Sequence, residues 1–203
     1  MKRKLLSLSL ALLLAAAPIS ALAAGLLSDI WGTPIPSATP TPASGVFSFR
    51  EKVQWNMSLE LVKALENIEL VERFNGAWSI LYPLSPVEVS KFTADLVYMF
   101  YNDQLKMISY DFSSAAPDAD FLYLSGALDS VYGEHQEAGA AQIVTFMDQI
   151  YPGHYSAGDL KSCRGWTFGE DTLIYLFYHS DTAYTILYVN APAQVSGFVT
   201  TGL

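Results

Sequence analysis

The sequence predicts an α+β fold in which one antiparallel sheet carries helices packed on one face. Helical and strand-forming segments follow one another as a helix, a run of strands, further helices and a second run of strands. This order lacks the strict strand–helix alternation of parallel α/β proteins. Short turn sequences such as Asn75-Gly76 and Asn102-Asp103 separate several strands and are typical of antiparallel hairpins. The two halves of the chain also resemble each other, which suggests two helix-plus-hairpin halves.

The first half contains an expected opening strand, a helix and four further strands. The opening strand is expected at residues 46–50. Ser58 suits the N-cap of the helix, and Glu60 in its first turn interacts favourably with the helix dipole. Apolar residues then recur at i, i+4 and i+7, as on one face of a helix: Leu61, Leu65 and Ile68. The strands that follow are expected at residues 78–82, 87–92, 95–101 and 104–112.

The second half contains two expected helices and three strands. Pro117 suits the first turn of a helix, which is expected to end at Gly133. Its apolar positions are Phe121, Leu124, Leu128 and Val131. A further helix is marked by Ile143, Phe146, Met147 and Ile150, and Pro152-Gly153 ends it. The last strands are expected at residues 161–168, 172–178 and 183–189.

The N-terminus has the features of a secretory signal peptide. Three basic residues at positions 2–4 precede an apolar run at 5–17 and the small-residue site Ala21-Leu22-Ala23. A membrane helix is the weaker alternative, because Pro18 interrupts a run shorter than the about 20 apolar residues that a span needs. We therefore expect a signal peptide at residues 1–24 and a secreted or envelope-associated protein without a membrane span in its mature form.

Residues 25–44 are expected to form a spacer, because proline, threonine and serine dominate their second half and favour extended conformations. An unstructured N-terminal tail is the alternative. Residues 45–203 are expected to form a single α+β domain. The single cysteine, Cys163, excludes an intramolecular disulfide and every metal site that needs several cysteines.

The charge of the chain argues against nucleic-acid partners. Lys and Arg total 11 against 20 Asp and Glu, a formal net charge of −9. Without the three bases at positions 2–4, 8 bases remain against 20 acids, so the mature chain carries −12. Such a chain repels phosphate backbones and anionic membrane surfaces.

The residues that could support catalysis form no recognisable motif. The histidines at 135, 154 and 179 lie 19 and 25 residues apart, without the spacing of a helical zinc site. Cys163 follows His154 by nine residues, but its surroundings match no nucleophile motif, and a free cysteine is more often a small buried apolar residue. We therefore expect no enzyme activity, no metal and no cofactor. A cell-wall or glycan hydrolase that uses carboxylates or His154 remains the alternative.

Tyrosine placement indicates a binding face. All 12 tyrosines lie after residue 81. Pairing strand 172–178 with strand 183–189 through a four-residue turn places Tyr175, Phe177, Tyr184 and Tyr188 on one face, and these four are the predicted binding residues. The alternative is that this face packs against another layer of the domain, and a one-residue error in the turn would reverse the assignment.

Several short motifs resemble those of a known family. The segments concerned are Trp-Asn-Met-Ser-Leu-Glu-Leu-Val at 55–62, Leu-Val-Tyr-Met-Phe at 96–100, Tyr-Asp-Phe at 110–112 and Leu-Asp-Ser-Val-Tyr-Gly at 128–133. They resemble uncharacterised exported domains of Gram-positive bacteria, which are in turn similar to small lipoproteins of outer-membrane assembly and to β-lactamase inhibitor proteins. Asn56 stands where that family has glycine. The resemblance implies a helix-and-sheet fold and a non-enzymatic binding module.

We therefore expect an exported, non-catalytic interaction module that binds a protein or an envelope component through its sheet face. A self-associating structural envelope protein is a further alternative, besides the hydrolase.

Overall fold

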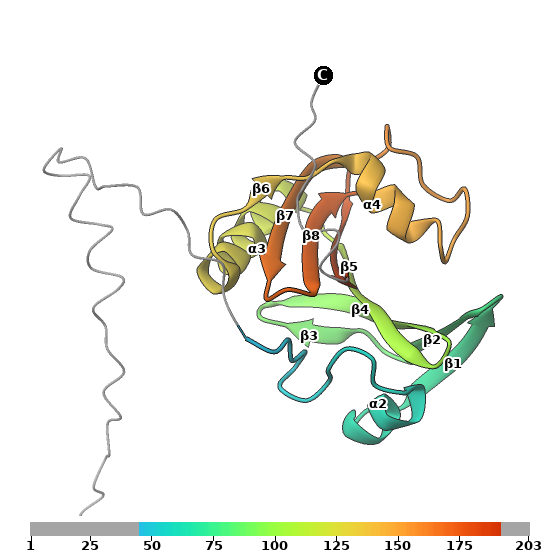
Figure 1. The fold of residues 1–203 in the computed structure, drawn as a ribbon. Helices are drawn as coiled ribbons and strands as arrows, with labels where there is room; N and C mark the ends of the chain where they lie inside the picture. The colour runs from blue at the N-terminus through green and yellow to red at the C-terminus, as the bar shows by residue number, and fades with distance from the viewer. Residues whose placement is uncertain (1–44, 192–203) are drawn as a thin grey trace, which may run out of the picture. The chain divides into compact units, whose positions relative to one another are not determined.

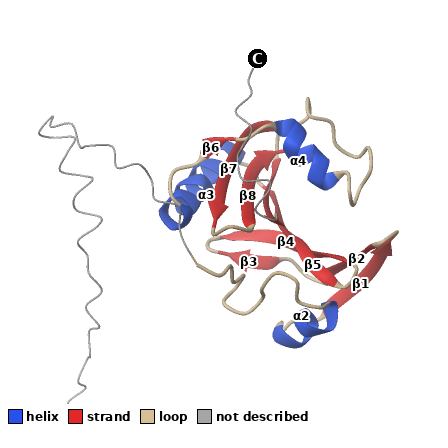
Figure 2. Ribbon diagram, viewed as in Figure 1, coloured by secondary structure: helices blue, strands red, loops and turns tan. Residues whose placement is uncertain are grey.

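The computed structural model describes residues 45–191, which form an open, nine-stranded antiparallel sheet with three helices (Figures 1 and 2). The predicted α+β class is confirmed. The predicted signal peptide, the spacer and residues 192–203 lie outside the described residues. Within those described, no helix is long and apolar enough to cross a membrane.

The two halves of the domain meet at the centre of the sheet. The elements of the first half are α2 (Leu59–Leu65), β1 (Leu70–Asn75), β2 (Trp78–Pro83), β3 (Val87–Val89), β4 (Phe92–Tyr101) and β5 (Gln104–Ser113). The elements of the second half are α3 (Pro117–Tyr132), β6 (Gln136–Glu137), α4 (Ala140–Met147), β7 (Lys161–Phe168), β8 (Thr172–Tyr178) and β9 (Ala183–Asn190). The strand order is β1-β2-β4-β5-β9-β8-β7-β6, with β3 paired to β4. The last strand of each half, β5 and β9, therefore pair with each other at the middle of the sheet.

The predicted opening strand at 46–50 is not formed. This segment makes only an isolated bridge between Phe49 and Val53. Arg50 and Glu51 have positive φ angles of 49° and 66°, so the backbone folds back at once and cannot continue as a strand. The segment instead buries Phe47, Phe49 and Val53 against the sheet.

Helix α2 ends at Leu65, before the last apolar position that was expected on its face, Ile68. Strand β1 begins at Leu70, where no strand was expected. The Ser58 hydroxyl accepts a hydrogen bond from the Leu61 amide at 3.3 Å, which confirms the expected N-cap. At the other end, the buried Glu66 carboxylate accepts a hydrogen bond of 2.5 Å from the Tyr98 hydroxyl and lies 3.5 Å from Arg50. Glu66 thus belongs to the core, in extended conformation, and the helix stops before it.

The sheet has an apolar core on each of its two faces. Every residue of β8 is buried. Ile174, Leu176 and Tyr178 belong to a first core, with residues of α2, α3 and the segment before α2. Leu173, Tyr175 and Phe177 belong to a second core, with residues of α4 and the segment after it. We call the two sides of the sheet the first face and the second face accordingly.

The helices therefore do not all lie on the predicted single face. Helices α2 and α3 pack on the first face, whereas α4 contributes Ile143 and Met147 to the second core. Figure 1 shows α3 and α4 on opposite sides of β7 and β8. The physical reason is the apolar character of β8 and β9, which leaves both faces of the sheet centre to be covered.

A single hydrogen bond joins the segment before α2 to the far end of the chain. The Trp55 indole N–H donates to the Thr172 hydroxyl at 2.7 Å, and both residues are buried. Thr172→Val keeps the shape but leaves a buried N–H without an acceptor, so it should lower the free energy of unfolding by about 1–3 kcal/mol. Urea unfolding measures this, with Thr93→Val on an exposed position of β4 as the matched control. Equal losses in the two variants would contradict the prediction.

Candidate functional site

The four predicted binding residues do not form a surface. Tyr175, Phe177, Tyr184 and Tyr188 are all buried. The register pairs Tyr178 with Tyr184, one residue away from the predicted pairing. Tyr184 and Tyr188 therefore belong to the first core, and Tyr175 and Phe177 to the second.

The prediction that these four residues share one face was wrong, because Tyr178 at the end of β8 pairs with Tyr184 and not with Ala183. The amides of His179 and Ser180 both donate to the Ala183 carbonyl, at 3.1 and 3.3 Å. Ala183, the first residue of β9, therefore has no partner on β8, and this slip of one residue reverses the face of every side chain in β9 relative to β8. The burial agrees with the alternative that these rings pack against other layers of the domain.

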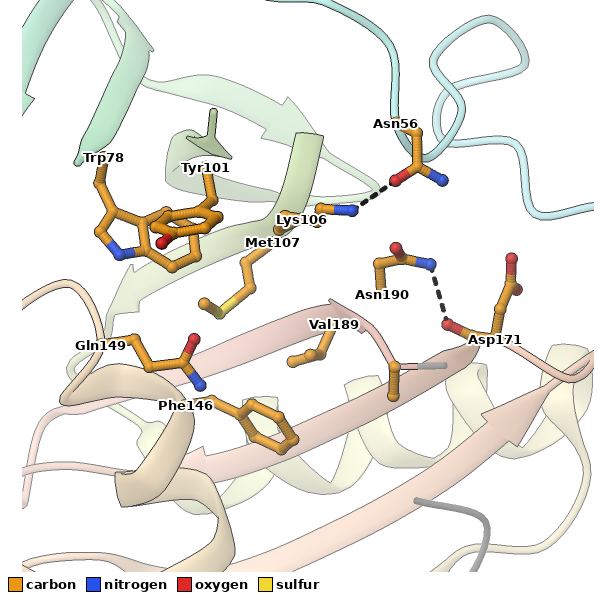
Figure 3. Close-up of a pocket in the computed structure, with 11 residues that line it drawn as sticks. Asn56, Trp78, Tyr101, Lys106, Met107, Phe146, Gln149, Asp171, Val189 and Asn190 are labelled. Atoms are coloured by element: carbon orange, nitrogen blue, oxygen red, sulfur yellow. Dashed lines mark hydrogen bonds between the residues drawn. The ribbon is translucent and has the colours of Figure 1, made fainter. Parts of the chain in front are cut away.

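An open pocket of about 860 Å³ lies on the second face, at the ends of strands β2, β4, β5 and β9 (Figure 3). Its apolar lining consists of Trp78, Tyr101, Met107, Phe146, Val189 and Ala191. Its polar lining consists of Asn56, Lys106, Gln149, Asp171 and Asn190. Four strands, helix α4, a strand-connecting turn and the segment before α2 thus converge on one space.

Aromatic rings form one wall of this pocket. Trp78 on β2 and Tyr101 on β4 are directly opposite in the sheet, with ring centroids 5.2 Å apart at an angle of 49°. Trp78 is 6% exposed and Tyr101 is 43% exposed, so the tryptophan supports a tyrosine ring that faces solvent. Phe146 on α4 lies across the pocket from this pair (Figure 3).

Polar side chains form the other wall. The Lys106 ammonium donates to the Asn56 side-chain oxygen at 2.5 Å, and the Asn190 amide donates to the Asp171 carbonyl at 3.3 Å (Figure 3). Asn56 has a φ of 62°, a left-handed conformation that asparagine adopts more readily than most residues. The one lysine and one aspartate of the lining give it no net formal charge.

A hydrogen bond links the β1–β2 hairpin to the segment that follows α4. The side-chain amide of Asn75 donates to the Ile150 carbonyl at 2.5 Å. The hairpin turn is thereby joined to the segment that follows α4. Phe146 and Gln149, which line the pocket, lie just before this point of contact.

A second, smaller cavity of about 240 Å³ lies on the same face and gathers titratable groups. Its polar lining consists of Ser109, Asp111, Tyr151, His154 and Tyr155. The Asp111 carboxylate accepts hydrogen bonds from Thr185 at 2.5 Å and from Ser109 at 3.2 Å. Desolvation raises the pKa of Asp111, although these hydrogen bonds oppose the shift.

His179 lies beside this cavity. Its ring makes an edge-to-face contact with the ring of Tyr155, with the two centroids 6.0 Å apart. Its Nε2 atom is buried, with no hydrogen-bond partner among the residues that the structure describes. Burial lowers the pKa of His179, the carboxylate of Asp111 acts to raise it, and His154 lowers it further. The cluster therefore combines an acid that holds its proton more strongly than usual with an imidazole that holds it less strongly.

Cys163 lies in the second core, where burial raises the pKa of its thiol to about 11. At neutral pH the thiol therefore keeps its proton and is a poor nucleophile. Among residues 45–191, no group of three or more histidine, cysteine or acidic side chains is placed to hold a metal ion.

Sequence reasoning did not find the residues of the pocket. Trp78 and Tyr101 each adjoin a tight turn, which is a local feature of the sequence. Their convergence with Phe146 and Asn190, however, depends on strand order and on the path of α4. Comparison of the chain with protein-family models, with curated proteins and with solved structures finds no match.

The raised pKa of Asp111 predicts a pH-dependent stability. Native Asp111 binds its proton more strongly than the unfolded chain does, so its ionisation lowers the stability of the fold as the pH rises above the ordinary pKa of an aspartate, about 3.9. Asp111→Asn removes this loss. The variant also lacks the carboxylate charge that raises the pKa of His179. The imidazole of the folded variant therefore binds its proton less strongly still, and this also makes the variant more stable relative to the parent as the pH rises. Relative to the parent, the variant should gain stability between about pH 4 and about pH 7.

Urea unfolding at both pH values tests this prediction. Asp181→Asn, at an exposed carboxylate in the β8–β9 turn, controls for the loss of one negative charge. Parallel pH profiles of the parent and Asp111→Asn would contradict the expected shift.

Proposed function

We propose that this chain is an exported, non-catalytic binding module that takes its ligand in the 860 Å³ pocket on the second face of the sheet. The observation that carries the proposal is the composition of this pocket, in which an exposed aromatic ring faces several amide side chains. Small-molecule and cofactor sites span about 300–1,000 Å³, are largely apolar and carry a few placed polar groups. The pocket lies within that range of volume, and its lining likewise combines apolar side chains with a few polar groups.

The pocket is also supported as a binding site by its preformed walls. Tyr101 is held by the buried Trp78, and Lys106 is held by Asn56. A ligand that meets groups already fixed in place loses less free energy to ordering than one that must organise them. The features of a signal peptide support export, and the resemblance to exported domains supports a binding role in the cell envelope.

Tyr101→Ala tests the proposal, because it removes the ring that faces solvent and leaves the buried Trp78 in place. The parent and the variant are immobilised and incubated with the envelope fraction of the producing organism, and bound glycans and proteins are identified by mass spectrometry. Tyr123→Ala on α3 is the matched control, since Tyr123 is 46% exposed and lies outside the pocket. We expect a component that the parent and the control retain and Tyr101→Ala loses. Equal retention by all three proteins would refute the proposed site.

A glycan hydrolase is the second candidate function, and the smaller cavity favours it. Asp111 and His154 line this cavity together, and Asp95 lies directly opposite Asp111 on the neighbouring strand. A carboxyl group with a raised pKa is what a general acid requires.

The hydrolase candidate predicts that the parent shortens cell-wall glycan and that Asp111→Asn abolishes this activity. Release of new reducing ends is the measurement, and the unfolding curves described above show whether the variant is folded. A parent protein that releases no reducing ends rules this candidate out.

A further inference from the structure

We infer that the ligand of the pocket is a neutral oligosaccharide. This inference rests on the proposed function, because it assigns a chemical class to the ligand of the same pocket. Three properties of the lining carry it: one exposed ring on a fixed support, side-chain amides around it, and the absence of net formal charge within the lining.

The aromatic wall suits the C–H faces of a sugar ring. The face of an aromatic ring carries partial negative charge, and the axial C–H groups of a pyranose carry partial positive charge. Tyr101 offers such a face to solvent, and Trp78 beneath it fixes the orientation of the ring. Phe146 supplies a second apolar surface across the pocket (Figure 3).

The polar wall suits hydroxyl groups. Each sugar hydroxyl both donates and accepts hydrogen bonds, and so does each side-chain amide. Asn56, Gln149 and Asn190 bring three amides to this pocket. The Asn56 side-chain oxygen accepts a hydrogen bond from the Lys106 ammonium (Figure 3).

The charge of the pocket disfavours ionic ligands. An anion would meet one cation, Lys106, which already donates to Asn56, on a chain with a net charge of −9. A cation would meet one carboxylate, Asp171, whose side chain accepts a hydrogen bond from Thr172 at 3.0 Å. Neither ion would find the paired opposite charges that recognition of a desolvated charge requires.

The location of the pocket also disfavours an extended peptide. A peptide that adds to a sheet needs the free backbone groups of an edge strand. The pocket lies on a face of the sheet, and β4, β5 and β9 are interior strands, each with a neighbouring strand on both sides. Its ligand must therefore be recognised by side chains, as a sugar ring is.

Isothermal titration calorimetry of the purified full chain tests the inference. The probes are linear tetrasaccharides of glucose, of N-acetylglucosamine and of mannose. We expect at least one of them to bind, Tyr101→Ala to weaken that binding about tenfold, and Tyr101→Phe to keep it, since the ring face remains. Binding should also change little between about 0.05 and about 0.5 M salt, because no charge is recognised.

The outcomes separate this inference from the proposed function. If no tetrasaccharide binds with a Kd below about 1 mM, the ligand class is wrong. The proposed function then still stands if capture from the envelope depends on Tyr101, and it fails with the inference if capture does not. Binding of a tetrasaccharide that is equal in the parent and in Tyr101→Ala overturns the inference as well. Tyr123→Ala and the far-ultraviolet circular dichroism of each variant exclude loss of fold as the cause.

Discussion

The centre of the sheet is apolar on both of its faces, and the rest of the structure follows from this constraint. All seven residues of β8 and six of the eight residues of β9 are buried. A strand of this kind is stable only when both faces are covered, because exposure of either side would leave several large apolar side chains in water. The domain meets the requirement with α2, α3 and the segment before α2 on the first face, and with α4 and the segment after it on the second.

The two covers are unequal in size, and the pocket lies where the smaller one ends. Helix α4 has eight residues and is therefore about 12 Å long. Eight strands in the main path of the sheet, about 4.8 Å apart, span about 34 Å. A single short helix cannot cover that width, and the second face opens into the pocket at the ends of β2, β4 and β5, where Phe146 of α4 is part of the lining. The first face carries the 16-residue helix α3 as well as α2.

Local features of the sequence were enough to predict most of the elements but not their faces. The strands at 161–168 and 172–178 and the start of α3 at Pro117 were predicted at the residues where they occur, because turn residues and a first-turn proline act locally. The face assignment of Tyr184 depended on the register between β8 and β9, and it was reversed because Tyr178 pairs with Tyr184 and not with Ala183. The short strands β1 and β6 and the pocket were also missed. Strand β6 and the pocket depend on distant segments, as when Gln136 pairs with Gly165, and a single sequence contains no direct sign of such pairing. Strand β1 pairs with the adjacent β2 across the turn after Asn75, and it was missed because the helix was expected to run on to Ile68.

The two faces also differ in how their polar groups are satisfied, and this difference supports the proposed site on the second face. On the first face the buried Glu66 is matched within the protein, by the Tyr98 hydroxyl and by Arg50. On the second face, Asp111 receives two hydroxyl donors but lines a cavity, and Tyr101 directs a ring to solvent. Charged and polar groups that are matched internally stabilise a fold, whereas those that border open space are available to a ligand. Under the proposed function, the first face holds most of the core and the second face presents the site.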